Sequence, residues 1–295
     1  MAQTIGIVGL GLVGQALGAR LRAAGLHTLG YDRSPQAAQA FGQAGGELAA
    51  SLAQLAEAAE TVLLAVFDTQ GVLEVVEGPA GLLAQPHSVR LLLDCSTGSP
   101  DLLLGLGARL AQRGIAFVEA PLSGSSQQIG AGEAVALVGA QDAAYAQAAP
   151  LLALLARESI HIGPPGMGAK AKLATNLVLG LNRAVFAEGL AFAESLGIAP
   201  EQFLALVLAT PARSEAAAVK GPQMVAQDFA PRSRIRQHQK DVTLMLDSAR
   251  AQGLDLPLSR VHAALLAEAV AQGRGELDNA AIVLQLRGRK SPGGA

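Results

Sequence analysis

Cysteine is almost absent from this chain of 295 residues, which contains Cys95 and no other cysteine. A single cysteine excludes an intrachain disulfide and any metal site built from several cysteines. We therefore expect Cys95 to serve as a small buried apolar residue, and we predict no metal site in this protein.

Long runs of one charge sign and long apolar runs are also missing. The 22 Lys+Arg and 24 Asp+Glu are scattered, with a formal net charge of -2, which argues against nucleic acid or an anionic membrane as the main partner. Gly, Pro or a charged residue interrupts every apolar run before the roughly 18–20 residues needed to span a bilayer. No basic region precedes the first apolar segment, so that segment predicts a strand and not a signal peptide. We expect a cytoplasmic protein.

Apolar residues are abundant, and in the first half of the chain they occur in short runs separated by more polar stretches. Hydrophobic residues make up 51% of the chain and the mean hydropathy is +0.35, enough for two cores at about 100–200 residues per domain. Over residues 1–163, Leu-rich or β-branched runs alternate with Ala-, Gln- and Glu-rich stretches, an order that predicts an α/β domain with a mostly parallel sheet. The predicted strands are 4–9, 27–32, 61–66, 89–94, 115–120 and 134–139, and the predicted helices are 12–24, 35–44, 51–58 and 101–113.

The second half of the chain has a different character. Strand signals stop after residues 160–168, and from 169 to 197 only two isolated glycines interrupt a helical pattern. A long helix is therefore predicted to open an all-α domain over residues 164–290, which we assign to the substrate and to oligomerisation. Its further predicted helices are 201–208, 213–227, 238–252, 258–272 and 278–287, and residues 291–295 are expected to be a frayed tail.

GLGLVG, residues 9–14, lies between the first predicted strand and the first predicted helix. In that context Gly9 permits a tight turn, Gly11 lets backbone approach a pyrophosphate, and Gly14 lets the helix pack on the strand. The helix start, with Leu12 and Val13, offers free N–H groups and the positive end of its dipole to phosphates. The motif predicts a Rossmann-type, doubly wound dinucleotide-binding domain, against the alternative that the glycines only make a tight turn.

Asp32 ends the second predicted strand, about eighteen residues after the motif. A carboxylate there would accept hydrogen bonds from the adenosine ribose hydroxyls and repel a 2′-phosphate, which favours NAD. Arg33 keeps NADP open, because an arginine beside the acid would grip a 2′-phosphate or stack on adenine. The other interpretation of Asp32 is a turn residue ahead of Ser34.

Four further stretches carry a resemblance to a known family. They are DCSTGSP (94–100), EAPLSGS (119–125), GPPGMGAKAKLATN (163–176) and QKD (239–241). Together with GLGLVG, and in this order over nearly the whole chain, they resemble the β-hydroxyacid dehydrogenase family. The resemblance implies an NAD(P)-dependent oxidoreductase that transfers hydride between nicotinamide and a small β-hydroxy acid, or its semialdehyde or keto form.

The resemblance also implies the site residues. Lys172 would be the general acid/base; Asn176 lies four residues on, on the same helix face, whereas Lys170 is rotated by about 200° and is expected to reach solvent. A free lysine has a pKa of about 10.4, so this amine needs burial or nearby positive charge, such as Lys240, to act as a base near neutrality. The remaining implied residues are Ser123, Gly124, Ser125 and Lys240 for the substrate, and Val66, Phe67, Ser96, Thr97 and Lys240 for the cofactor.

Some features depart from the family pattern or leave alternatives. The usual S-G-G is S-G-S here, and its extra hydroxyl suggests a polar substrate. The residues around Lys240 and the segment 273–283 resemble branches of the family that act on polyhydroxylated acids, and this resemblance implies such a substrate over a branched-chain one. An NADPH-dependent reductase of glyoxylate or a semialdehyde, or a non-catalytic cofactor-binding scaffold, remain as alternatives, while an imine reductase is disfavoured by Lys172. A homodimer or homotetramer is expected.

Overall fold

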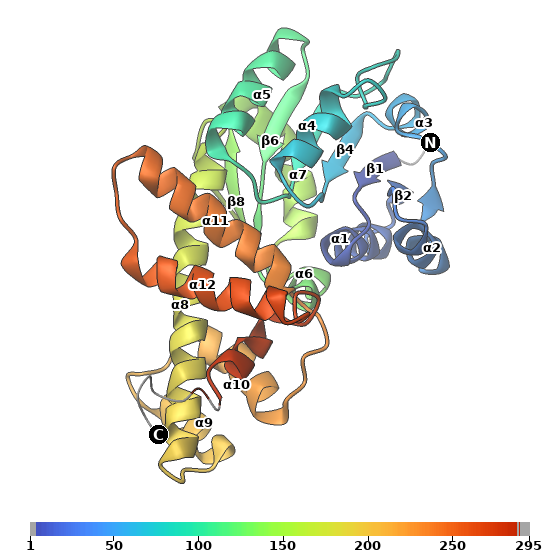
Figure 1. Ribbon diagram of the computed structural model, residues 1–295. Helices are drawn as coiled ribbons and strands as arrows, with labels where there is room; N and C mark the ends of the chain where they lie inside the picture. The colour runs from blue at the N-terminus through green and yellow to red at the C-terminus, as the bar shows by residue number, and fades with distance from the viewer. Residues whose placement is uncertain (1–3, 288, 290–295) are drawn as a thin grey trace. The chain divides into compact units, whose positions relative to one another are not determined.

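A computed structural model of the protein describes residues 4–287 and 289. Its chain forms two compact units, Met1–Lys172 and Leu173–Ala295. The first is drawn from blue to yellow-green in Figure 1 and the second from yellow to red. The predicted tail, 291–295, lies outside the described residues.

The first unit is built on one sheet with nine strands among the described residues, in the order β3-β2-β1-β4-β5-β6-β8-β7, with β9 paired to β8. All pairs are parallel except β6 with β8 and β7 with β8. The strands are β1 Thr4–Val8, β2 His27–Tyr31, β3 Glu47–Leu48, β4 Thr61–Leu64, β5 Leu91–Asp94, β6 Ala116–Glu119, β7 Leu122–Ser123, β8 Val135–Ala140 and β9 Glu158–Gly163.

Helices cover both faces of this sheet, which is why its strands are apolar on both sides. In β4, Leu63 belongs to the core shared with α1, α2, α6 and α7, whereas Val62 and Leu64 belong to the core shared with α3, α4 and α5. The helices of this unit are α1 Leu12–Ala23, α2 Pro35–Gln43, α3 Leu52–Ala58, α4 Thr69–Glu77, α5 Pro100–Gln112, α6 Ser126–Ala131 and α7 Asp142–Leu155. The predicted doubly wound Rossmann-type fold is confirmed, and Cys95 is buried in the first of these cores as expected.

Six elements of the first unit were not predicted from the sequence: β3, β7, β9, α4, α6 and α7. The last of these, α7, carries Pro150 in its interior, a residue that normally argues against a helix. In α4, three valines among nine residues favour a strand by intrinsic propensity, and tertiary packing of Val72 and Val76 overrides that preference.

Helix α8, Met167–Ser195, is the long helix predicted from the sequence, and the unit boundary falls within it, between Lys172 and Leu173. The second unit contains the rest of α8 with α9 Pro200–Ala209, α10 Glu215–Ala226, α11 Ile235–Ala251, α12 Pro257–Ala271 and the 3₁₀ helix η1 Asn279–Gln285. Helices α11 and α12 pack against each other, and Figure 1 shows them side by side. The prediction of an α-helix over 278–287 is corrected to a 3₁₀ helix, and α11 begins three residues earlier than predicted.

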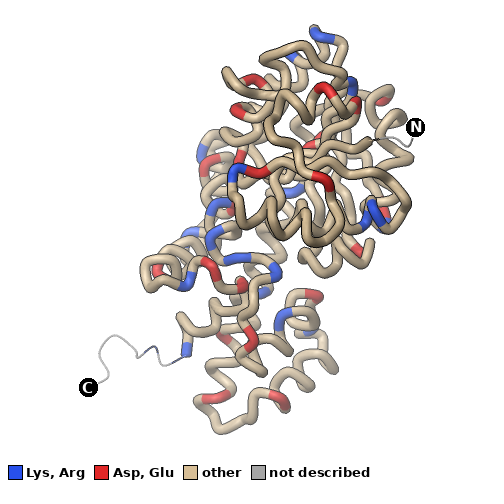
Figure 2. Tube along the Cα trace, turned by 90° about the vertical axis from the view of Figure 1, so that its right-hand side faces the viewer, with Lys and Arg blue, Asp and Glu red and all other residues tan. Residues whose placement is uncertain are grey.

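Acidic and basic residues occur in both units, as the blue and red segments of Figure 2 show. Within residues 4–287 and 289, none of the helices combines the length and the apolar character that crossing a bilayer requires. In the same residues, no group of three or more His, Cys, Asp and Glu side chains is arranged to hold a metal ion.

Candidate active site

The glycine-rich motif forms the turn between β1 and α1, at the carboxyl end of β1. Gly9 adopts φ +90°, and its N–H donates to the carbonyl oxygen of Tyr31 across 3.0 Å. A Cβ atom on Gly9 would lie 2.4 Å from the carbonyl oxygen of Ala65, and one on Gly14 would lie 1.9 Å from the carbonyl oxygen of Gly9. Both positions therefore require glycine for close backbone packing.

Gly11 differs from Gly9 and Gly14, because no other part of the chain approaches it closely. It is exposed, and a Cβ added there would have no heavy atom within 4 Å, so its missing side chain leaves open space above the start of α1. As N-cap residue it has no side chain to bind the first-turn N–H groups, which include those of Leu12 and Val13. An uncapped helix start beneath an open backbone turn fits the pyrophosphate of a dinucleotide.

Asp32 follows β2 and lies against this turn. Its Oδ2 accepts a hydrogen bond from the Leu10 N–H at 2.6 Å, and its Oδ1 accepts one from the Ser34 N–H at 2.7 Å. The carboxylate thus shapes the turn as well as ending the strand, and each oxygen retains acceptor capacity for a further donor. Arg33 beside it is exposed.

The carboxyl ends of β4 and β5 carry the next group of predicted residues. The Val66 N–H donates to the Ser96 Oγ at 3.1 Å, which joins the two loops, and the Ser96 N–H donates to the Asp94 Oδ1 at 2.9 Å. Ser96 is buried and Thr97 half-buried, whereas the Phe67 side chain is 44% exposed. The strand register sets β4 and β5 side by side, so these loops lie at the same edge of the sheet as the glycine-rich turn.

The S-G-S segment, residues 123–125, leads from β7 into α6. Ser125 and Gln128 form a capping box: the Gln128 N–H donates to the Ser125 Oγ, and the Ser125 N–H donates to the Gln128 Oε1 at 2.8 Å. The extra hydroxyl therefore has a structural use as a helix cap. Its presence alone is no longer an indication of a polar substrate.

Lys172 lies in the second turn of α8, where it is buried with a side chain that has 6% of its surface exposed. Its Nζ donates to the Leu122 carbonyl oxygen at 2.7 Å. Lys170, two residues earlier, is exposed as predicted. The helix thus turns one amine into the interior of the first unit and the other outwards.

In the second unit, Asp241 joins two of the residues predicted from the sequence. The Asn176 Nδ2 donates to the Asp241 Oδ2 at 3.3 Å, and the Lys240 Nζ lies 3.0 Å from the Asp241 Oδ1. All three residues are largely buried. Asp241 was not singled out by the sequence reasoning, although it is the last letter of the QKD motif.

Sequence reasoning also missed a buried polar network around Asp278. This carboxylate accepts hydrogen bonds from the Lys220 Nζ at 2.7 Å and from the N–H groups of Arg232, Ser233 and Ala280, each at 2.9 Å. Burial lowers the pKa of Lys220, an effect that the charge of Asp278 opposes. The only sign of this network in the sequence is a single acid, Asp278, in a turn-rich segment. That sign is too weak to predict the network.

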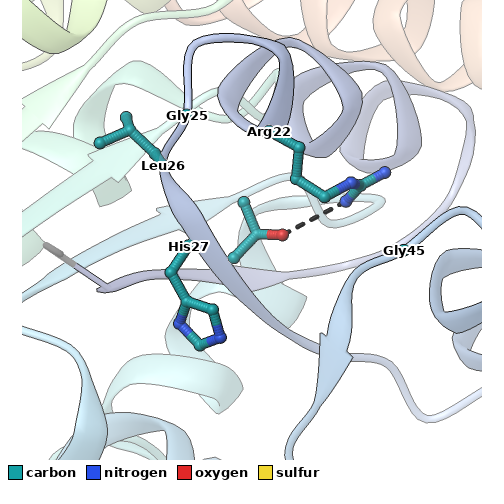
Figure 3. Close-up of a pocket in the computed structure, with 6 residues that line it drawn as sticks. Arg22, Gly25, Leu26, His27 and Gly45 are labelled. Carbon is teal, nitrogen blue, oxygen red and sulfur yellow. Dashed lines mark hydrogen bonds between the residues drawn. The ribbon is translucent and has the colours of Figure 1, made fainter.

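None of these residues lines a surface hollow of about 290 Å³ in the first unit. Figure 3 shows it beside the beginning of β2, with Arg22, Gly25, Leu26, His27 and Gly45 around it and Arg22 donating to the Thr28 hydroxyl. The hollow is at the amino end of β2, whereas the glycine-rich turn is at the carboxyl end of β1. Ligands of doubly wound sheets bind at the carboxyl ends, so this hollow is not the candidate site.

Comparison with known proteins agrees with this geometry. Residues 4–163 match the model for the NAD binding domain of 6-phosphogluconate dehydrogenase, and residues 166–286 match the model for the NAD-binding domain of NADP-dependent 3-hydroxyisobutyrate dehydrogenase. The fold, the glycine-rich turn and these matches define the class: an NAD(P)-dependent oxidoreductase.

Relatives of the whole chain narrow the class. The chain is 29% identical to L-threonate dehydrogenase of Cupriavidus necator over 100% of both chains. It is 30% identical to 2-hydroxy-3-oxopropionate reductase of Escherichia coli, over 96% of each. A crystal structure of 3-hydroxyisobutyrate dehydrogenase from Salmonella typhimurium is 26% identical, with a TM-score of 0.85 over 96% of this chain and 99% of that one. The protein belongs to the β-hydroxyacid dehydrogenase family.

Proposed function

We propose that the protein interconverts a small β-hydroxy acid and its semialdehyde or keto form, with Lys172 as the general acid/base. The observation that carries this proposal is the burial of the Lys172 amine, which donates to the main-chain carbonyl oxygen of Leu122 in β7 at 2.7 Å. The bound nicotinamide supplies the hydride acceptor or donor. In oxidation the neutral Nζ takes the proton of the substrate hydroxyl, and in reduction the ammonium returns it.

A general base needs the neutral form of the amine, and the general acid of the reverse reaction needs the ammonium. The Leu122 carbonyl oxygen accepts a hydrogen bond from either form, so it fixes the position of Nζ without forcing it to stay charged. A carboxylate in the same place would stabilise the ammonium far more strongly. The main-chain acceptor therefore suits an amine that must gain and lose a proton in each cycle.

The other predicted residues take roles in binding. We assign Gly9, Gly11, Leu12, Val13 and Gly14 to the cofactor pyrophosphate, and the loops of Val66, Phe67, Ser96 and Thr97 to the rest of the cofactor. Ser123, Gly124 and Ser125 are assigned to the substrate carboxylate through hydroxyl and N–H donors, and Asn176 to the substrate carboxylate or hydroxyl. Asp241 orients Asn176 and balances the charge of Lys240, which we assign to both cofactor and substrate.

The cofactor preference in this proposal is NAD. Asp32 presents a carboxylate at the end of β2, and a 2′-phosphate beside it would meet like charge. Arg33, exposed next to it, is the feature that favours the second candidate function, an NADPH-dependent reductase of glyoxylate or a semialdehyde. The glyoxylate/succinic semialdehyde reductase 1 of Arabidopsis thaliana, 25% identical over 95% of this chain, supports that candidate.

A polyhydroxylated acid is the substrate class we favour. Support comes from the names of the two relatives described above, one of them a dehydrogenase of L-threonate and the other a reductase of 2-hydroxy-3-oxopropionate. Both compounds carry more than one oxygen function besides the carboxylate. The chain shares about 30% identity with each, a level at which substrate preference diverges within a fold.

The experiment that tests the function follows the absorbance of reduced nicotinamide in the purified protein. Threonate, glycerate, 3-hydroxyisobutyrate, 3-hydroxypropionate and serine are tested with NAD and with NADP, and the reverse reaction is tested with glyoxylate and 2-hydroxy-3-oxopropionate. Turnover of a polyhydroxy acid with NAD is the expected result. Cofactor binding by fluorescence titration without turnover of any of these compounds would instead favour the non-catalytic scaffold.

Assembly into a cytoplasmic homodimer or homotetramer completes the proposal, with residues 164–290 as the oligomerisation domain. Helix α8 and the residue after it support it, because one exposed stripe carries Val178, Val185 and Phe192 of the helix and then Leu196, with 57%, 67%, 63% and 62% of their surfaces accessible. At 1.5 Å per residue this apolar stripe is about 27 Å long. Light scattering on Phe192→Asp should show smaller particles than the unmodified protein.

A further inference from the structure

Glu119, the last residue of β6, holds the beginning of α8. Its Oε1 accepts hydrogen bonds from the N–H of Gly168 at 2.6 Å and from the N–H of Ala169 at 3.2 Å. These are first-turn N–H groups, which have no partner within the helix. A fully buried side chain from a strand therefore caps the helix that carries Lys172 one turn later.

The same short segment of chain holds Lys172 itself. Leu122, three residues after Glu119, provides the carbonyl oxygen that accepts from the Lys172 Nζ. Residues 119–122 thus contact α8 at two points, one at the first-turn N–H groups and one at the amine. A shift of the helix start relative to this segment would move the amine away from its acceptor.

Two glycines make room for the contact. A Cβ on Gly139, which pairs with Glu119 across β6 and β8, would lie 2.0 Å from the Glu119 Oε1 and 2.6 Å from the Gly168 nitrogen. A Cβ on Gly168 would lie 2.6 Å from the Leu137 carbonyl oxygen. The backbones of β8 and α8 approach so closely that the carboxyl group fits only because both side chains are absent.

A second carboxyl group lies beside the first. Asp94 and Glu119 are register partners on the parallel strands β5 and β6, both fully buried and both on the same face of the sheet. Burial raises the pKa of Glu119 to about 7, the N–H groups of α8 oppose that shift, and Asp94 adds to it. A buried acid with a buried acid for a neighbour costs stability when both ionise.

We propose that Glu119 is a proton-linked positioning residue for Lys172: when ionised it anchors the first turn of α8 and holds the amine in place, and when protonated it loosens that anchor. The charged form binds N–H groups more strongly than the neutral form does. An effect of Glu119 on turnover rests on the function proposed for Lys172. The anchoring of α8 by Glu119 does not depend on that function.

The groups that face Glu119 are few. Strand β5 presents the Asp94 carboxyl group, α8 and the turn before it present the N–H groups of Gly166, Gly168 and Ala169, and β8 presents Gly139. Asp94 in turn accepts from the Ser96 N–H, whose hydroxyl accepts from Val66. Asp94 therefore connects Glu119 to the loops of Val66 and Ser96, which are assigned to the cofactor.

The first test uses trace acetylation of the purified protein, with the ratio of labelling at Lys172 to that at Lys170 read by peptide mass spectrometry. Lys170 is exposed on the same helix and serves as the internal standard. Glu119→Gln keeps the size and one acceptor oxygen but cannot ionise, and should raise the ratio about threefold at a pH of roughly 8, because its neutral hydrogen bonds are weaker. Glu119→Asp keeps the charge but loses reach, and should also raise it.

Ser51→Ala is the matched control, because Ser51 caps α3 through the Gln54 N–H and has no part in the site. It should lower the melting temperature slightly and leave the labelling ratio unchanged. Glu119→Gln should melt no lower than the unmodified protein at that pH, since it removes a buried charge. An unchanged ratio in a folded Glu119→Gln protein would overturn the inference.

The second test uses the pH dependence of kcat for reduction, where proton donation by the ammonium makes activity fall at high pH. Ionisation of Glu119 should add a rising limb near pH 7, which Glu119→Gln removes because it cannot ionise. Persistence of that limb in Glu119→Gln would contradict the proton linkage. Turnover by Lys172→Ala would instead overturn the proposed function, and the labelling ratio would still decide the role of Glu119.

Discussion

The Nζ of Lys172 donates a hydrogen bond to the carbonyl oxygen of Leu122 across 2.7 Å, and the lysine side chain is almost completely buried. Lys172 is the last residue of the first unit, so this contact belongs wholly to the Rossmann-type unit. The position of the amine is thus set by the strand edge that follows β6. Its chemistry can be tested separately from cofactor binding, because no predicted cofactor residue makes this contact.

Removal of the amine is the most direct test. Lys172→Ala should lower kcat by about two to four orders of magnitude, the usual contribution of a general acid/base, with NAD affinity by fluorescence titration nearly unchanged. Lys170→Ala is the matched control and should retain full turnover, since that side chain is exposed. Retained turnover in Lys172→Ala would remove the acid/base assignment.

Cofactor discrimination should depend on the charge of Asp32. Asp32→Ser should weaken NAD binding and relax the preference against NADP, because the repulsion of a 2′-phosphate is lost. Asp32→Asn separates charge from shape, since its amide oxygen can still accept from the Leu10 N–H that holds the glycine-rich turn. An unchanged ratio of kcat/KM for the two cofactors in both variants would mean that Asp32 is only a turn residue.

Acid should destabilise the second unit through His262. Burial lowers the pKa of this side chain to about 4, with the charge of Arg183 as the second cause, whereas a free histidine titrates near 6.5. Between those values the unfolded chain binds more protons than the folded one, so stability is full above about pH 6.5 and is lost as the pH falls towards 4.

The loss assigned to His262 is at most about 3 kcal/mol over that window. Chemical denaturation of the unmodified protein and of His262→Gln at several pH values measures it, and the variant should show the shallower slope. Glu119 acts in the opposite direction, because its raised pKa makes the folded state bind the extra proton between about pH 4.5 and 7. A steeper acid slope in His262→Gln would contradict the prediction.

Close packing at the start of α8 predicts a sharp difference between two glycines. Gly139→Ala would set a methyl group on the Glu119 carboxyl and should destabilise the protein by about 1–3 kcal/mol or more. Gly130→Ala, in α6, meets no heavy atom within 4 Å and should be neutral or slightly stabilising, because alanine favours a helix. Equal melting temperatures for the two variants would contradict the packing described here.

Much of the fold could be predicted from the sequence because its strands are covered on both sides and therefore read as plain apolar runs. Six strands and the long helix α8 were found in this way. Strands β3 and β7, with two residues each, have no periodicity to detect. Strand β9 alternates in burial, and the glycine and prolines that follow it obscured its pattern.

The candidate site was predictable where its residues belong to local motifs, as in residues 9–14 and around Lys172. It was not predictable where the contact joins distant segments. Nothing in the spacing of Glu119 and Gly168, 49 positions apart, indicates that one caps the other. The same holds for Asp241 and Asn176, 65 positions apart, and for the use of Ser125 as a cap, which requires knowing that α6 exists.

Helix α8 runs without interruption from residue 167 to residue 195, across the boundary between the two units. A chimera that combines the first unit of one family member with the second unit of another must therefore be joined within this helix or before it. A chimera joined at residue 173 would take Lys172 from one parent and Asn176 from the other. A junction at residues 164–166 would transfer both together but would take the Leu122 acceptor of Lys172 from the other parent, so hybrids of either kind draw the residues assigned to the site from both parents.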